Sequence, residues 1–262
     1  MTTQLVRILE DRGPWFLVPL FYIGLISSAE LLIAVAAPRA GMILHCLLLP
    51  GLLWHAACAA RKQDRALLAC LAFAPLTRII TLWLSFPELP QTRQHLLASL
   101  PLFAAVWVAW RMLGYSRHTF GLVLRGLPIQ MAVGLTGLIL GALEYLILRP
   151  PPLTSSLAFR EVWQPVLILL VCTGLSEELI FRGLILRAST DCLGAWGLWY
   201  TALLFATMQI GQRSPAHFAL AFVMGAVWAW IVRRTGSLLG VALAHGLTNI
   251  VVLLVMPFVL GP

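Results

Sequence analysis

Long apolar runs separated by short polar breaks fill most of the chain of 262 residues. A helix that crosses a lipid bilayer needs about 20 mostly apolar residues. The pattern therefore predicts an all-α fold, a polytopic transmembrane helix bundle of about eight or nine spans. The predicted spans are about Trp15–Ala37, Met42–Ala60, Ala66–Phe86, Leu96–Leu113, Leu127–Leu148, Val162–Leu186, Ala195–Ile210, Ala216–Val232 and Leu238–Leu260.

Three consecutive prolines divide this pattern. They follow Arg149, and proline stops helix propagation because it lacks a backbone N–H and clashes with the preceding turn. We therefore expect two parts: residues 1–150 as an N-terminal membrane-spanning half of about five helices, and residues 151–262 as a C-terminal helical core. No stretch is long and polar enough to form a separate soluble domain.

Composition agrees with a membrane protein, since 60% of the residues are hydrophobic and only 11% are charged. The net charge of +8 does not indicate nucleic-acid binding, because the basic residues lie singly or in small groups between apolar runs rather than in one stripe. Such a distribution is typical of orientation signals. Five cysteines without a CxxC pair predict neither a disulfide framework nor a thiolate metal site.

The basic residues of alternate loops predict the orientation. Eleven lie on the side of the N-terminus and five on the other side. Cytoplasmic loops carry the excess of Lys and Arg, so we expect a multi-pass protein with a cytoplasmic N-terminus. The first group is Arg7, Arg12, Arg61, Lys62, Arg65, Arg111, Arg117, Arg125, Arg187, Arg233 and Arg234; the second is Arg39, Arg93, Arg149, Arg160 and Arg213.

The stretch Ser176–Leu184 places two carboxylates and a guanidinium inside an apolar run. Ionisable groups at membrane depth are costly and by default mark a functional site. Glu178 and Arg182 are four residues apart and share a helix face, so they are expected to pair. Glu177 is rotated by about 100° from Glu178 and is free to point into a cavity. A purely structural ion pair that locks helices together is the alternative for Glu178 and Arg182.

A second polar pair lies in the last predicted span, where His245 and Asn249 are again four residues apart. Both can donate hydrogen bonds to a developing oxyanion, although His245 could instead bind a metal or serve only in packing. We expect structural roles for Glu30, Arg78 and Glu144, and Glu30 and Arg78 could pair between helices.

Together these residues resemble the CAAX-protease and bacteriocin-processing (CPBP) family of intramembrane glutamic proteases, over roughly residues 160–252. The family's Glu-Glu-x-x-x-Arg motif matches Glu177, Glu178 and Arg182, and its His-x-x-x-Asn/Asp motif matches His245 and Asn249. The segment Arg234-Thr235-Gly236-Ser237-Leu238 is also similar. The resemblance implies that residues 151–262 form a CPBP-like catalytic core.

One motif departs from the family. Where the family has Phe-x-x-x-His, this chain has Phe205 and Gln209. Glutamine can orient a water but cannot take a proton. Three interpretations remain: Glu177 suffices as the base with Gln209 orienting the water, another histidine such as His217 replaces the missing one, or proteolysis has been lost and a binding role kept.

The resemblance implies that Glu177 and Gln209 activate a water, that His245 and Asn249 stabilise the oxyanion, and that Glu178 and Arg182 hold the site. It implies no metal and no cofactor. The expected partners are the lipid bilayer and a membrane-embedded protein or peptide substrate, and the expected cleavage is at a C-terminal sorting or processing signal. A bacterial inner membrane is the expected location.

Two alternatives to a protease stay open. A catalytically inactive relative would act as a membrane binding or immunity protein and would tolerate loss of Glu177. A transporter would be expected to show repeated halves or helices broken at corresponding positions, and the sequence has neither.

Overall fold

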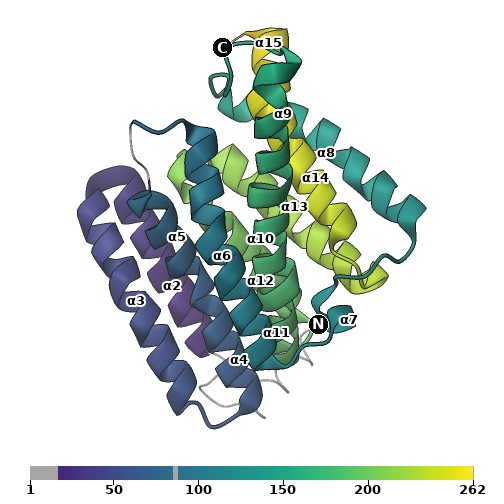
Figure 1. The fold of residues 1–262 in the computed structure, drawn as a ribbon. Coiled ribbons are helices and arrows are strands. Elements are labelled where there is room, and N and C mark those ends of the chain that lie inside the picture. Colours follow the sequence, from purple (N-terminus) through teal and green to yellow (C-terminus); the bar gives the residue numbers. More distant parts are fainter. Residues whose placement is uncertain (1–16, 85–87, 262) are drawn as a thin grey trace.

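The computed structural model describes residues 17–84 and 88–261, and within these ranges it consists of helices and their connections (Figure 1). The predicted all-α transmembrane bundle is therefore confirmed. Arg7 and Arg12, the first residues of the first predicted span and the end of the third lie outside the described residues.

The helices follow one another in an order close to the predicted one. They are α2 Leu17–Leu31, η2 Leu32–Ala36, α3 Pro38–Cys58, α4 Lys62–Leu71, α5 Phe73–Trp83, α6 Gln91–Leu113, α7 Arg117–Phe120, α8 Leu127–Leu148, α9 Phe159–Ile168, η3 Leu169–Leu175, α10 Ser176–Glu178, η4 Leu179–Ile185, α11 Leu186–Leu193, α12 Trp196–Thr207, η5 Ile210–Gln212, α13 Pro215–Thr235, α14 Leu239–Ile250, η6 Val251–Val255 and α15 Met256–Leu260.

Seven helices of the described chain are long and apolar enough to cross a membrane, slightly fewer than the eight or nine predicted spans. The difference arises at two places. The predicted span Ala195–Ile210 is the 12-residue helix α12, which at 1.5 Å per residue reaches only about 18 Å, less than the bilayer core. The predicted span Val162–Leu186 lies in the run α9–α11, which is not among the seven.

Local sequence explains where several helices begin and end. Ser214 accepts a hydrogen bond from the backbone N–H of His217 and Pro215 opens α13, as expected of an N-cap followed by proline. The same helix ends at Gly236, whose φ of 71° is left-handed. At the end of α8, Arg149 adopts a left-handed φ of 45° directly before the three prolines.

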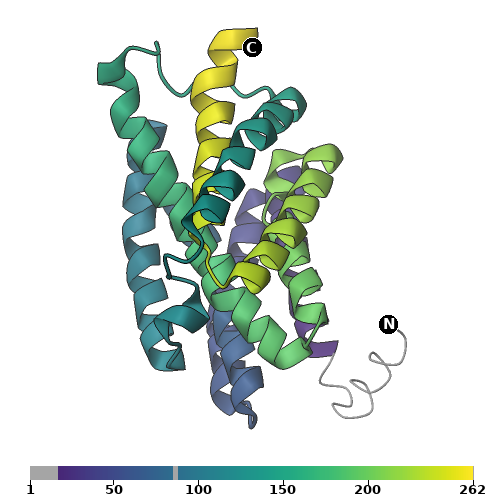
Figure 2. The same cartoon turned by 90° about the vertical axis from the view of Figure 1, so that its right-hand side faces the viewer.

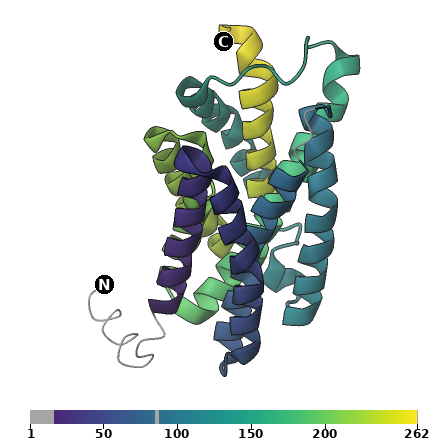
Figure 3. The same ribbon diagram turned by 90° about the vertical axis from the view of Figure 1, so that its left-hand side faces the viewer.

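Successive long helices alternate in direction, which gives the bundle two ends (Figures 1 and 3). We call the end at which α2 begins the N-terminal face and the end at which α15 stops the C-terminal face. The connections at the N-terminal face are α3–α4, α6–α8, α11–α12 and α13–α14; those at the C-terminal face are α2–α3, α5–α6, α8–α9 and α12–α13.

Glycines let α8 and α14 approach closely. A Cβ added at Gly137 would lie 2.2 Å from the carbonyl oxygen of Ala244, and one at Gly141 would lie 2.7 Å from that of Thr248. Small residues at helix contacts are the usual way in which membrane helices pack, because they bring backbones together. Since α8 precedes residue 150 and α14 follows it, helices of both predicted halves pack together. The division itself stays a prediction.

A second close approach joins η3 to α14. A Cβ added at Gly174 would lie 2.7 Å from the backbone nitrogen of Gly246, and one at Gly246 would lie 2.9 Å from the Cα of Leu170. Gly174 lies three residues before Glu177, and Gly246 follows His245. The two glycines therefore bring the polar motifs of the two helices together.

Candidate active site

The helical run α9–α11 carries both glutamates near its middle. Figure 2 shows it as one inclined run through the bundle. The three-residue segment α10 lies between the π-helical segments η3 and η4. The Thr173 hydroxyl donates to the Leu169 carbonyl at 2.6 Å, and the Ser176 hydroxyl donates to the Cys172 carbonyl at 2.5 Å. Both are the contacts that Ser and Thr hydroxyls make with the carbonyl four residues earlier in a helix, and π-turns occur often at functional sites.

Glu178 is the centre of a buried polar cluster. Its Oε1 accepts from Arg182 Nη1 at 2.9 Å and lies 2.8 Å from His245 Nδ1. The side chains of Glu178 and Arg182 are both fully buried. The predicted pairing of these two residues is therefore present in the structure. Since an ionised carboxylate only accepts hydrogen bonds, His245 donates through Nδ1 and presents Nε2 on the other side of its ring.

Aromatic rings enclose the guanidinium of Arg182. Its Cζ lies 4.5 Å from the ring centre of Phe205 and 5.3 Å from that of Trp228. Both rings also contact His245, with centroid separations of 6.0 Å and 5.2 Å. Cations over aromatic faces are attracted by the ring quadrupole, more strongly away from water. Phe205, the first residue of the departing motif, thus packs against both other motifs.

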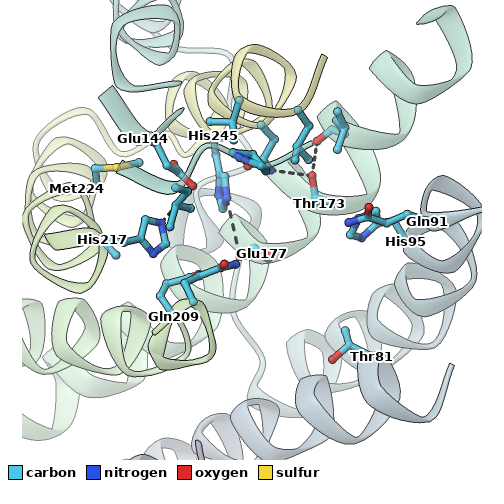
Figure 4. A pocket seen from close by; sticks show the side chains of 18 of the residues that line it. Thr81, Gln91, His95, Glu144, Thr173, Glu177, Gln209, His217, Met224 and His245 are labelled. Atoms are coloured by element: carbon cyan, nitrogen blue, oxygen red, sulfur yellow. Dashed lines mark hydrogen bonds and ion pairs between the residues drawn. The ribbon is translucent and has the colours of Figure 1, made fainter. Parts of the chain in front are cut away.

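Glu177 faces a cavity of about 590 Å³, which we call the Glu177 cavity. His245, Asn249 and Gln209 also line it, whereas Glu178 and Arg182 do not. The Glu177 side chain is 32% exposed, and its Oε2 lies 3.8 Å from His245 Nε2. This separation is too long for a direct hydrogen bond and suits a shared water. Figure 4 shows Glu177 and His245 at this cavity. Of the two adjacent carboxylates, Glu177 is accessible and Glu178 is fixed.

Thr173 also belongs to this site, although it is not among the site residues predicted from the sequence. Its hydroxyl oxygen accepts from Asn249 Nδ2 at 2.9 Å and lines the same cavity. One amide hydrogen of Asn249 is thereby used, and the other remains available. Thr173 lies four residues before Glu177, so helical spacing from Glu177 is the signal that would have found it.

Gln209 directly follows Met208, whose backbone carbonyl is bound by Arg78 from the N-terminal half. Arg78 Nη2 donates to the Met208 carbonyl at 2.7 Å, and Arg78 Nε donates to Glu30 Oε1 at 2.7 Å. His45 Nε2 lies 3.2 Å from the same Glu30 oxygen. The possible pairing of Glu30 with Arg78 is therefore present. In Figure 4 the Gln209 side chain points toward Glu177.

His217 lines the Glu177 cavity together with Glu144. His217 Nε2 lies 3.1 Å from Glu144 Oε1, and the side chains are 5% and 16% exposed. From the sequence, His217 was one candidate to replace the missing motif histidine, and a structural role was predicted for Glu144. Both residues line the cavity, and the Glu144 carboxylate binds His217 Nε2.

Within residues 17–84 and 88–261, no group of three or more His, Cys, Asp or Glu side chains is arranged to hold a metal ion. The expectation of a site without metal or cofactor stays a prediction.

A comparison with protein families agrees with the geometry. The family model described as type II CAAX prenyl endopeptidase Rce1-like matches residues 159–251. This segment runs from the first residue of α9 to the first residue of η6 and contains all six predicted site residues. No curated protein and no solved structure matches the chain. Residues 159–251 therefore carry an Rce1-like CAAX prenyl endopeptidase (CPBP) family domain, the domain of a protease family.

Proposed function

We propose that the protein is an intramembrane glutamic-type endopeptidase that cleaves a membrane-associated protein or peptide. One observation supports this most: Glu177 faces the cavity 3.8 Å from His245 Nε2, while Glu178 is held by Arg182 and His245. This arrangement suits water activation, because a general base must lie within reach of the proton that it takes, and Glu178 fixes the position of the histidine that faces Glu177.

In this mechanism Glu177 takes a proton from a water that lies between its carboxylate and His245. The water oxygen attacks the carbonyl carbon of the scissile peptide bond. The proton on Glu177 then passes to the nitrogen of the leaving amine, and the carbon–nitrogen bond breaks. Glu177 is thus the base in the first step and the acid in the second.

The oxyanion formed by this attack needs donors fixed in advance. Asn249 supplies its second amide hydrogen, since Thr173 accepts the first. His245 supplies Nε2 when its ring carries both protons, because Nδ1 is directed at Glu178. Glu178 and Arg182 act as positioning residues, since neither lines the cavity.

Gln209 takes the place of the motif histidine by orienting the water rather than by accepting its proton. Its position on the Glu177 cavity, after a carbonyl held by Arg78, supports this role. The same glutamine also favours a second candidate, an inactive relative that binds membrane proteins or acts in immunity. The two candidates differ in whether the Glu177 carboxylate is needed.

We further propose a multi-pass location in a bacterial inner membrane with the N-terminus in the cytoplasm. The family supports a membrane protein as substrate. Cleavage at a C-terminal sorting or processing signal is the proposed specific activity, and it rests on the resemblance alone.

The test compares new protein termini in membranes of cells that express the wild type or Glu177→Gln at equal levels. We expect termini that are present with the wild type and absent with the variant. Asp191→Asn is the matched control, because Asp191 pairs with Arg187 on α11 far from the cavity and is expected to leave the termini unchanged. Identical termini in all three strains would favour the binding protein.

A variant of the departing motif refines the result. If Gln209 orients the water, Gln209→His is expected to keep the same termini and raise their yield, since histidine can also accept a proton. Loss of the termini would mean that the amide has a role that histidine cannot perform.

A further inference from the structure

In the part of the chain that the structure describes, the Glu177 cavity reaches the connections of one end of the bundle. Its rim comes from three connections at the C-terminal face: Gln91 at the start of α6, Arg149 after α8, and Gln212 in η5. None of the residues that line it comes from the four connections of the N-terminal face. A substrate segment therefore enters from the C-terminal face.

Basic residues are concentrated at the opposite end. In the described chain nine Lys and Arg residues lie at or beside the connections of the N-terminal face, and five lie at the C-terminal face. The structure keeps the helix directions alternating even though α12 is short, so each residue stays on its predicted side. The nine are Arg61, Lys62, Arg65, Arg111, Arg117, Arg125, Arg187, Arg233 and Arg234; the five are Arg39, Arg93, Arg149, Arg160 and Arg213.

Two further pockets at the N-terminal face differ in kind from the Glu177 cavity. One, of about 320 Å³, is apolar and lies among Leu20, Trp196 and Trp199. The other, of about 290 Å³, includes Arg187 and Arg233. Neither shares a lining residue with the Glu177 cavity. Aromatic and basic groups of this kind suit the headgroup region of a cytoplasmic leaflet.

The cavity lining is suited to a polypeptide backbone. Four of its side chains are amides, and each amide offers both a donor and an acceptor, as a peptide group does. They are Gln91, Gln209, Gln212 and Asn249. An extended peptide could use them in turn along the path from the rim to Glu177.

We infer that the Glu177 cavity opens on the non-cytoplasmic side of the membrane, and that its substrate is a polypeptide whose scissile bond lies at the non-cytoplasmic end of its membrane anchor. The basic N-terminal face marks the cytoplasmic side. A substrate anchored on the cytoplasmic side would meet the closed end of the bundle. The inference about the substrate rests on the proposed protease function, whereas the direction of opening does not.

Cysteine labelling tests the direction of opening without any need for activity. The five native cysteines are replaced by alanine, and a single cysteine is introduced as Gln212→Cys or Gln91→Cys, which are exposed rim positions on different elements. Lys62→Cys, exposed in the first turn of α4, is the control at the other face. The probe is a membrane-impermeant maleimide applied to spheroplasts before and after permeabilisation.

We expect both rim cysteines to be labelled in intact spheroplasts to the level reached after permeabilisation, and Lys62→Cys to be labelled only after it. Rim cysteines that are labelled only after permeabilisation, or not at all, would overturn the inference. The termini from the Glu177→Gln comparison test the substrate. New termini in non-cytoplasmic segments of other proteins would support the inference about the substrate. New termini in cytoplasmic segments would contradict that inference but would still support the proposed protease function.

Discussion

Replacing Gly137 by alanine is expected to push α8 away from α14 and to displace His245, which follows the contacted residue Ala244. The added Cβ would lie 2.2 Å from the carbonyl oxygen, 2.9 Å from the carbonyl carbon and 3.0 Å from the Cα of Ala244. Ordinary contact begins at 3.4 Å, so the nearest separation is short by more than an ångström. All three atoms belong to the backbone, so no side chain can turn away, and the helices themselves must move.

The net effect combines two opposing terms. Alanine is favoured over glycine inside a helix by about 1 kcal/mol. Overpacking a tight contact typically costs about 1–3 kcal/mol, and occasionally more. Because the obstacle is backbone, we place Gly137→Ala at the upper end of that range, which leaves a net loss of about 2 kcal/mol in the free energy of unfolding. Ala244 precedes His245, so proteolytic activity is expected to fall as well.

Gly24→Ala is the matched control. Gly24 lies in α2, and a Cβ added there would meet nothing within 4 Å. This variant is expected to be as stable as the wild type or up to about 1 kcal/mol more stable. The assay is reversible unfolding in mixed detergent micelles, followed for the three proteins under the same conditions. Equal unfolding free energies for the two variants would refute the claim that the backbone of α14 leaves no room for a side chain at position 137 of α8.

Two other predictions concern the polar cluster. Arg182→Met should lower the free energy of unfolding by about 3–5 kcal/mol because it leaves Glu178 buried without its cation. Adding Glu178→Gln to this variant should recover most of that loss. A double-mutant cycle measures the coupling between the two residues, and additive effects of the two substitutions would contradict the predicted pairing. Thr173→Val removes the oxygen that accepts from Asn249 and should slow proteolysis by about a hundredfold if the amide shifts by an ångström. Thr136→Val, on the exposed side of α8, should leave the rate unchanged, and equal rates for both variants would show that Asn249 needs no such support.

The sequence was informative wherever helical spacing decides the geometry. Glu178 and Arg182 are four residues apart on one helix, and their pairing followed from that spacing alone. The accessible position of Glu177 also followed, because adjacent residues point in different directions. These relations are local, so they do not depend on how the helices pack.

Relations between helices were not available from the sequence. The bond from His245 to Glu178 joins residues 67 positions apart, and it depends on the close contact between Gly174 and Gly246. The π-helical segments on either side of α10 have no simple composition signal, and they shift the phase of the side chains beyond them. The length of α12 was overestimated because apolar residues continue past the point where its helix ends.

The bond from Arg78 to the Met208 carbonyl has a consequence for how such a chain can vary in evolution. The segment that resembles the Rce1-like family does not contain α5 or Glu30. Yet Arg78 of α5 holds the backbone just before Gln209, and Glu30 in turn holds Arg78. The matched segment is therefore not a portable unit that could be joined to any other set of N-terminal helices. We expect the glutamine at position 209 to occur together with Glu30 and Arg78. Homologues that differ at one of these three positions should differ at the others as well.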